Sequence, residues 1–138
     1  MNMKEWNKGK WIFKDIHGYG YPYLYIHPYK QEAVKYLVDN RPDWITHIIV
    51  FGSSVRKSHL WTSDLDICVL GGNFRSTEEL VNIRLKKIKY DFLCYLDKDM
   101  LFNLIKTGSV EKYITEEGVM VYERQDFAGQ GTDRYSSS

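Results

Sequence analysis

The sequence has few of the residues that would indicate a disulfide scaffold, a membrane protein or a nucleic-acid binder. Its 138 residues include only two cysteines, too few for a disulfide framework or a cysteine-built zinc site. No apolar run approaches the roughly 20 residues needed to cross a bilayer, and the first ten residues lack the apolar core of a signal peptide. The net charge is +1, so no dense basic surface is expected to neutralise nucleic-acid phosphates. These absences predict a cytoplasmic protein without membrane binding or strong nucleic-acid binding.

The chain is otherwise ordinary for a globular protein, except that its aromatic residues gather at one end. Hydrophobic residues make up 43% and charged residues 27%, and the length fits one domain. Eight aromatic residues precede Lys30: Trp6, Trp11, Phe13, Tyr19, Tyr21, Tyr23, Tyr25 and Tyr29. We therefore divide the chain into an aromatic-rich extension (1–29), a central domain (30–124) and a polar tail (125–138). The extension is expected either to pack on the domain or to form an interface, and the tail is expected to be mobile.

Hydrophobic periodicity and capping residues predict alternating helices and strands in the central domain. Strands are expected at 44–51, 65–70, 90–96 and 119–122, and helices at 28–39, 76–88, 97–107 and 110–117. Pro28 suits the first helical turn, Ser76 with Glu79 forms a capping box, and Asp97 or Asp99 is expected to cap the helix at 97–107. The predicted fold is α/β (α+β), with a small mixed sheet of three to four strands flanked by helices.

The most informative stretch joins a buried strand to a pair of aspartates. The strand 44–51 ends in Gly52-Ser53, and Asp64 and Asp66 begin the next strand ten residues later. Residues at i and i+2 of a strand point to the same face, so these two carboxylates should lie a few ångströms apart. They would repel each other unless a cation lies between them, and Mg²⁺ prefers such oxygen ligands. A glycine-serine turn with bare backbone N–H groups favours phosphate, so the stretch predicts a nucleotide site.

A third carboxylate, Asp91, begins the strand 90–96 and would lie beside this pair if the two strands are neighbours. Two Mg²⁺ ions could then be held, one activating the attacking oxygen and the other steadying the leaving phosphates. Asp91 would serve as a ligand or as the base that accepts the hydroxyl proton. The predicted reaction is in-line displacement at an α-phosphate with release of pyrophosphate.

These residues resemble the nucleotidyltransferase superfamily that includes DNA polymerase β. The spacing of Gly52-Ser53 and Asp64-Leu-Asp66 is similar to the minimal nucleotidyltransferases (MNT) of HEPN–MNT toxin–antitoxin pairs. The resemblance extends from about Ala33 to Tyr122 and includes the closing helix–Gly–strand at 114–122. It makes 30–124 the nucleotidyltransferase domain. It implies that Asp64, Asp66 and Asp91 bind the metals and act in catalysis, and that Gly52 and Ser53 hold the triphosphate with Arg56 nearby.

The prediction is therefore a Mg²⁺-dependent nucleotidyltransferase that moves a nucleoside monophosphate, with AMP from ATP favoured, to a hydroxyl. The chain leaves little room for a second domain that would hold a small acceptor, so we expect the acceptor on another protein, such as a HEPN toxin. One alternative is a non-enzymatic antitoxin or nucleotide-binding module that acts by contact. Another is a drug-modifying nucleotidyltransferase.

A purely structural interpretation also remains open. Gly52-Ser53 could be a plain turn, Asp64 a strand-edge carboxylate and Asp91 a solvated residue at a strand end. The four histidines show no metal-ligand spacing, although His59 falls inside the loop of the predicted site.

Overall fold

The computed structural model describes residues 26–55, 62–72, 77–85 and 87–124. Nearly all of the predicted extension (1–29) and all of the tail (125–138) lie outside these residues. Arg56 and His59 also lie outside them.

A four-stranded mixed sheet forms the centre of the described domain, as the sequence predicts. Its strands are β1 (His47–Phe51), β2 (Leu65–Leu70), β3 (Tyr90–Tyr95) and β4 (Val119–Glu123). Their order across the sheet is β3-β2-β1-β4. Strand β1 runs antiparallel to both β2 and β4, whereas β2 and β3 are parallel. This order makes the second and third predicted strands neighbours, which is the condition on which the role predicted for Asp91 depends.

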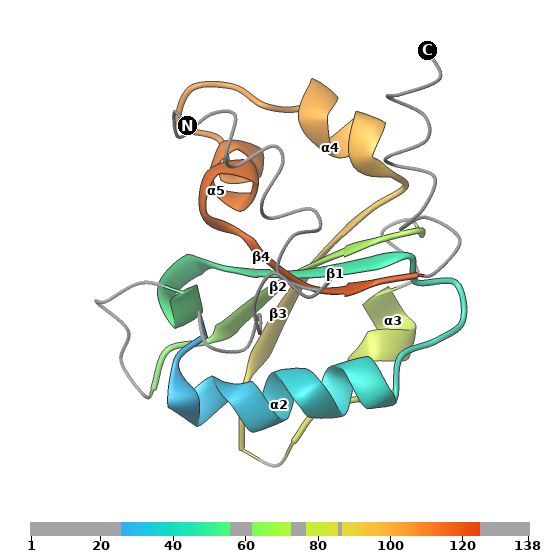
Figure 1. Ribbon diagram of the computed structural model, residues 1–138, viewed down its shortest axis with the longest axis vertical. Coiled ribbons are helices and arrows are strands. Elements are labelled where there is room, and N and C mark those ends of the chain that lie inside the picture. The colour runs from blue at the N-terminus through green and yellow to red at the C-terminus, as the bar shows by residue number, and fades with distance from the viewer. Residues whose placement is uncertain (1–25, 56–61, 73–76, 86, 125–138) are drawn as a thin grey trace.

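Helices cover both faces of the sheet, giving three layers (Figure 1). Helices α2 (Pro28–Asp39) and α3 (Thr77–Leu80) lie on one face, and α4 (Lys98–Asn103) and α5 (Val110–Glu117) lie on the other. A short 3₁₀ helix, η3 (Gly52–Val55), follows β1 directly. Local signals begin these helices where expected: Pro28 occupies the first turn of α2, and the Asp97 carboxylate accepts the Met100 N–H at 2.9 Å to cap α4.

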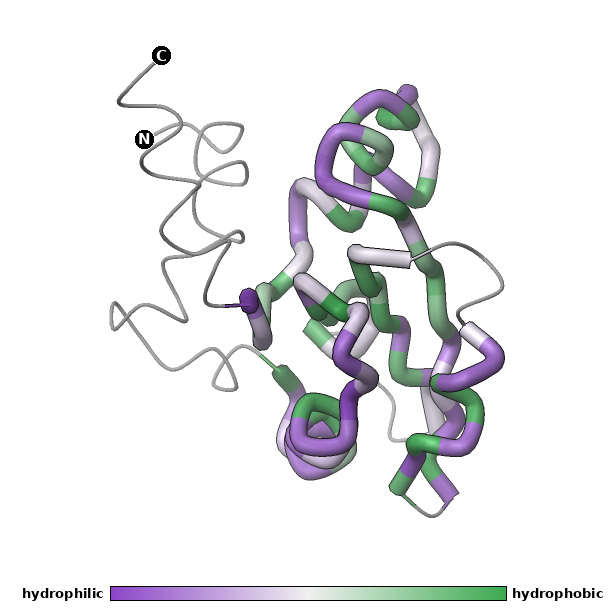
Figure 2. Tube along the Cα trace, turned by 90° about the vertical axis from the view of Figure 1, so that its right-hand side faces the viewer, coloured by the Kyte–Doolittle hydropathy of each residue, from purple (hydrophilic) through white to green (hydrophobic). Residues whose placement is uncertain are grey.

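The sheet separates two apolar clusters because successive residues of a strand point to opposite faces. Leu65, Ile67 and Val69 pack with α2 in the first cluster, whereas Cys68 and Leu70 pack with α4 and α5 in the second. Figure 2 shows hydrophobic segments along the strands between the two helical layers. Asp66 shares the face of Cys68, so it belongs to the α4–α5 side. Among the described residues, no helix has the length and apolar character needed to span a membrane.

Three predicted elements differ from the structure by more than one residue. The helix expected at 97–107 ends at Asn103, where the Leu104 N–H donates to the Leu101 carbonyl oxygen at 3.2 Å. The strand expected at 44–51 begins only at His47, because the Ile45 N–H turns back to the Pro42 carbonyl oxygen at 3.2 Å. The helix expected at 76–88 ends at Leu80, and the half-buried Ile83, Leu85 and Ile88 pack against the first cluster without helical backbone. The Leu85 N–H donates to the Tyr90 hydroxyl oxygen at 3.2 Å, and this contact takes the place of a helical hydrogen bond.

Candidate nucleotide site

A pocket of about 340 Å³ lies where β1 ends and β2 and β3 begin. It contains four residues that the sequence predicts for the site, together with apolar and aromatic walls. The lining residues are Phe51, Gly52, Ser53, Asp66, Asp91, Leu93, Val110 and Tyr113. The phosphate-turn residues and two of the three predicted carboxylates therefore meet in one cavity.

Gly52 is needed at this position for two separate reasons. Its φ is +77°, a left-handed conformation that costs a residue with a Cβ about 1–2 kcal/mol. In addition, a Cβ placed on Gly52 would lie 2.2 Å from Asp66 Oδ2, well inside van der Waals contact. The Asp66 carboxylate thus packs directly against the backbone of the turn. The turn and the aspartate strand can approach this closely only through glycine.

Asp66 and Asp91 occupy the same register position on the parallel strands β2 and β3. Neighbouring strands lie about 4.8 Å apart, and paired residues point to the same face, so the two side chains project side by side into the pocket. Asp66 is half-buried and Asp91 is exposed. Two carboxylates that share a site disfavour each other's charge, and a cation between them removes that cost.

Asp64 lies two residues before Asp66 but does not line this pocket. Its carboxylate lies 3.9 Å from Lys89 Nζ, and both side chains are substantially exposed. An ion pair so open to solvent contributes little stability. Of the predicted trio, Asp66 and Asp91 therefore line the pocket, whereas Asp64 pairs with Lys89 and is not among the lining residues.

Helix α5 forms a wall of the pocket that sequence reasoning did not include. Val110, Tyr113 and Glu117 recur at i, i+3 and i+7, a spacing that places them on one face of a helix. Val110 and Tyr113 line the cavity, and Glu117 Oε1 accepts the Gly52 N–H at 3.1 Å. The i, i+3, i+7 spacing was visible in the sequence. Nothing local indicated that this face turns toward Gly52, which lies 65 residues from Glu117.

The donor set of the pocket suits a divalent ion that arrives with a nucleotide. Mg²⁺ usually binds one or two protein carboxylates and takes its other ligands from phosphates and water. Asp66 and Asp91 supply two such carboxylates. Within the described parts of the chain, no group of three or more His, Cys, Asp or Glu residues is arranged to hold a metal. The three-carboxylate ligand set stays a prediction from the sequence, with Asp66 and Asp91 in the pocket and Asp64 paired with Lys89.

This combination of a mixed sheet, a glycine-serine turn and paired aspartates is typical of domains that act on nucleoside triphosphates. The family model described as polymerase beta, nucleotidyltransferase matches residues 31–127. The chain belongs to this family, which confirms the superfamily and the fold that the sequence predicts. Its reaction class is nucleotidyl transfer, which implies a nucleotide substrate and, for the family in general, a divalent metal. No curated protein matches the sequence.

Solved structures with a similar fold include two toxin–antitoxin complexes and an archaeal protein. A mutant MntA–HpeT toxin–antitoxin is 18% identical with a TM-score of 0.42, and the match covers 75% of this chain and 84% of that chain. A putative nucleotidyltransferase from Sulfolobus solfataricus is 16% identical with a TM-score of 0.45, covering 75% and 86%. A toxin–antitoxin with AMP-PNP is 21% identical with a TM-score of 0.43, covering 75% and 84%.

Proposed function

We propose that the chain transfers AMP from ATP, with Mg²⁺, to a hydroxyl group on a partner protein, as an antitoxin that modifies its toxin. The single observation that carries this proposal is the meeting of Asp66, Asp91, Gly52 and Ser53 in one pocket. Membership of the nucleotidyltransferase family supports the reaction class. The resemblance of the Gly-Ser and Asp-x-Asp spacing to the minimal group supports the protein acceptor.

Each proposed role follows from where the residue lies. The backbone and hydroxyl of the Gly52-Ser53 turn would bind the triphosphate, and Asp66 and Asp91 would hold the divalent ion, with Asp64 at the edge of the site. When bound, such an ion neutralises phosphate charge and favours the ionised form of the attacking hydroxyl. The acceptor oxygen would form a bond to the α-phosphorus while the bond to the bridging oxygen breaks and pyrophosphate leaves. Asp91, the exposed member of the pair, would accept the hydroxyl proton.

Exposed apolar side chains beside the pocket support a macromolecular acceptor. Tyr113 and Val110 line the pocket and yet are 47% and 38% exposed. Further exposed apolar residues lie at 96, 100 and 104, in or next to α4 on the same side of the sheet. Apolar surface rimmed by polar residues is typical of protein contacts. A partner that docks there would bring its hydroxyl to the mouth of the site.

The test is to incubate the chain with ATP, Mg²⁺ and the protein encoded beside it, which we expect to be a HEPN-type toxin, and to measure the partner's intact mass. We expect the partner to gain the mass of one AMP for each modified hydroxyl, and peptide mapping should place it on a tyrosine, serine or threonine. The gain should disappear with Asp66→Asn. If the partner's mass stays unchanged in the presence of ATP and Mg²⁺, the proposal of transfer to this partner is wrong.

A second candidate is an antitoxin that neutralises its partner by contact alone. One observation favours it: the Glu117 carboxylate already accepts the Gly52 N–H, a backbone donor that a triphosphate would otherwise use. This candidate predicts that Asp66→Asn still suppresses the toxin. The enzymatic proposal predicts that it does not.

A further inference from the structure

Lys30 is the most unusual charged residue of the described domain. It lies in the first turn of α2 and is only 1% exposed. Lysine is almost never buried to this extent unless the burial is compensated. Burial lowers the pKa of the Lys30 ammonium from its ordinary value, and the nearby Asp64 and Asp66 carboxylates oppose that lowering. A buried cation therefore lies within electrostatic reach of two of the predicted site aspartates, although nothing in the proposed reaction uses it.

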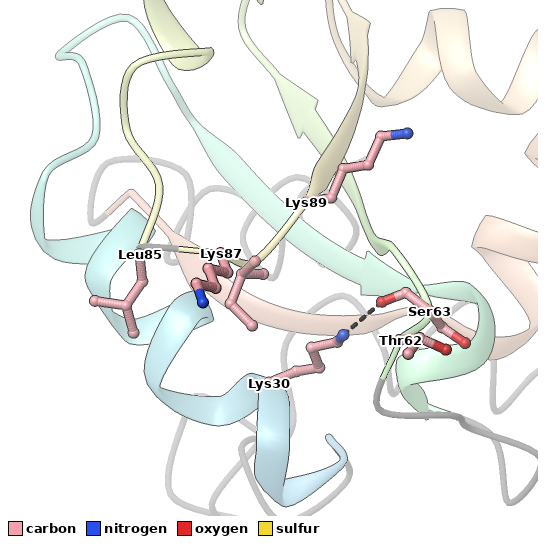
Figure 3. A pocket seen from close by; sticks show the side chains of 7 residues that line it. Lys30, Thr62, Ser63, Leu85, Lys87 and Lys89 are labelled. Atoms are coloured by element: carbon pink, nitrogen blue, oxygen red, sulfur yellow. Dashed lines mark hydrogen bonds between the residues drawn. The ribbon is translucent and has the colours of Figure 1, made fainter.

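The ammonium has a defined partner at the start of the aspartate strand. Lys30 Nζ donates a hydrogen bond to the Ser63 carbonyl oxygen at 2.5 Å, drawn as a dashed line in Figure 3. Ser63 directly precedes Asp64, and the next backbone N–H, that of Leu65, donates to the Lys89 carbonyl oxygen at 2.8 Å. The two consecutive peptide groups that lead into β2 are thus held, the first by Lys30 of α2 and the second by the residue that precedes β3.

The same end of α2 also holds the other half of the site. The His27 N–H donates to the Ser54 carbonyl oxygen at 2.8 Å, and Ser54 belongs to the turn that follows Gly52. Within four residues, the beginning of α2 therefore bonds to both the phosphate turn and the aspartate strand. These two segments must keep a fixed separation, because Asp66 Oδ2 packs against Gly52.

We propose that Lys30 is a positioning residue of the active site, which holds the Ser63 carbonyl and thereby sets the aspartates of β2 against the Gly52-Ser53 turn. The expected effect on catalysis rests on the proposed function, whereas the Lys30–Ser63 hydrogen bond, which we call the tether, does not. Misplacement of a reacting group by about 1 Å can reduce an enzyme's rate by about a hundredfold. Loss of the tether should therefore reduce turnover more than nucleotide binding, which depends mainly on the turn.

A cavity beside Lys30 makes the proposal testable by chemical rescue. It has a volume of about 510 Å³ and is lined by Lys30, Thr62, Ser63, Leu85, Lys87, Ile88 and Lys89. Figure 3 shows the Lys30 ammonium directed toward Ser63, whereas Lys89 extends away from it. In a Lys30→Ala variant, a small alkylammonium ion could enter through this cavity and donate to the Ser63 carbonyl in place of the lost side chain.

The experiment compares Lys30→Ala with Lys87→Ala, a lysine of the same cavity that is exposed and outside the proposed site. Hydrogen exchange of the Leu65 amide is measured first, without nucleotide or metal, with the β4 amides as a reference for global unfolding. We expect Leu65 exchange to rise about tenfold in Lys30→Ala while β4 exchange changes little, and no change in Lys87→Ala. Propylammonium should slow the Leu65 exchange again, and propanol, its neutral analogue, should not.

Single-turnover transfer is then measured on the same preparations. Lys30→Ala should lower the single-turnover rate constant at saturating ATP at least about tenfold, with the half-saturating ATP concentration within about threefold of the parent, and propylammonium should restore part of the rate. If Lys30→Ala does not fold, the same measurements are made on Lys30→Met, which keeps the apolar part of the side chain. The propylammonium rescue is then omitted. Unchanged Leu65 exchange, or an equal rise in β4, overturns the proposal. If the parental chain transfers no nucleotide, the proposed function fails, while the exchange result still decides whether Lys30 holds the strand.

Discussion

The two ends of strand β1 each gather ionisable side chains, but they do so in opposite ways. At the start of the strand, His47 Nε2 lies 3.2 Å from Glu123 Oε2, and His47 Nδ1 lies 2.8 Å from the Thr46 hydroxyl. His47, Glu123 and Thr46 are all buried. Each polar group there meets a complementary one, and the β1–β4 register pairs His47 with Glu123. The polar side chains at this end are thus buried and paired with one another, as apolar side chains are in a hydrophobic core.

The other end of β1 brings together groups of the same charge. Asp66 and Asp91 share a register position, and the Glu117 carboxylate bonds to the Gly52 N–H nearby. Asp66 and Asp91 line an open cavity and are not enclosed by other side chains. Buried polar groups that bond to one another stabilise a fold without a ligand. Neighbouring carboxylates repel each other, and their proximity becomes favourable only when a cation binds between them. The comparison indicates that the start of β1 is a structural contact, and it supports our proposal that the other end binds a ligand.

The largest effect is expected from Gly52→Ala, which adds a methyl group where the turn after β1 lies against Asp66. The new Cβ would meet Asp66 Oδ2 and would also occupy a left-handed backbone conformation. We expect transfer to fall below detection and the melting temperature to drop. Gly108→Ala separates the two causes, because Gly108 has φ +79° with nothing within 4 Å of its Cβ position. It should lose only about 1–2 kcal/mol of stability and keep its activity. Equal activity in the two variants would show that contact with Asp66 does not matter.

Neutralising either pocket aspartate should reduce activity by orders of magnitude without a loss of stability. Asp91→Asn changes almost no volume and relieves a like-charge pair, so the metal-free melting temperature should stay or rise. Asp66→Asn relieves the same pair but also removes one of the two carboxylates that oppose the lowered pKa of Lys30, so its melting temperature should stay close to that of the parent. Asp91→Asn should leave ATP affinity within a few-fold of the parent, while Asp66→Asn and Asp64→Asn weaken affinity and rate together. Calorimetry and single-turnover transfer on the same samples measure both quantities.

The contrasting aspartate is Asp97, which caps α4. Asp97→Ala should lower stability by about 1 kcal/mol and leave transfer intact. A several-degree loss of melting temperature in Asp66→Asn would instead mark Asp66 as a structural residue. Transfer by Asp91→Asn at a near-parental rate would exclude Asp91 from the chemistry.

Removal of divalent ions should weaken nucleotide binding, because the triphosphate would then face the carboxylates directly. Calorimetric titration with ATP should show at least about a tenfold loss of affinity in EDTA compared with Mg²⁺. The fold itself should not respond, so the melting temperature without nucleotide should be the same in both buffers. Equal ATP affinity in the two conditions would contradict the metal-dependent proposal.

The smallest effect is expected at the structural end, from the pH dependence of stability. Burial lowers the pKa of His47, the contact with Glu123 opposes this, and Lys98 and Arg124 add to the lowering. Neutral His47 therefore favours the fold, and stability should fall as the pH drops below about 6.5, by at most about 1.4 kcal/mol per pH unit. Urea unfolding at pH 7.5 and pH 5.5 measures this loss. His47→Gln should show a smaller loss than the parent, and an identical loss would assign it to other groups.

Local signals in the sequence predicted most elements of the fold. Strand β2 and helix α5 have the predicted bounds, and the Asp97 cap and the Pro28 start lie where expected. Capping and side-chain periodicity act over a few residues, so they can be read without tertiary contacts. The helix expected to reach residue 88 was wrong because Ile83, Leu85 and Ile88 have an apolar spacing that a packed irregular segment satisfies equally well.

The sequence by itself determined the chemistry of this protein: a glycine-serine turn after a buried strand, and aspartates at the starts of the next two strands. Only the tertiary structure decided how these groups meet. The parallel pairing of β2 and β3 places Asp91 beside Asp66, the fold brings Glu117 to Gly52, and the start of α2 buries Lys30 against Ser63. These contacts join residues that are 25 to 65 positions apart, and their energies depend on burial and strand order, which no local pattern encodes.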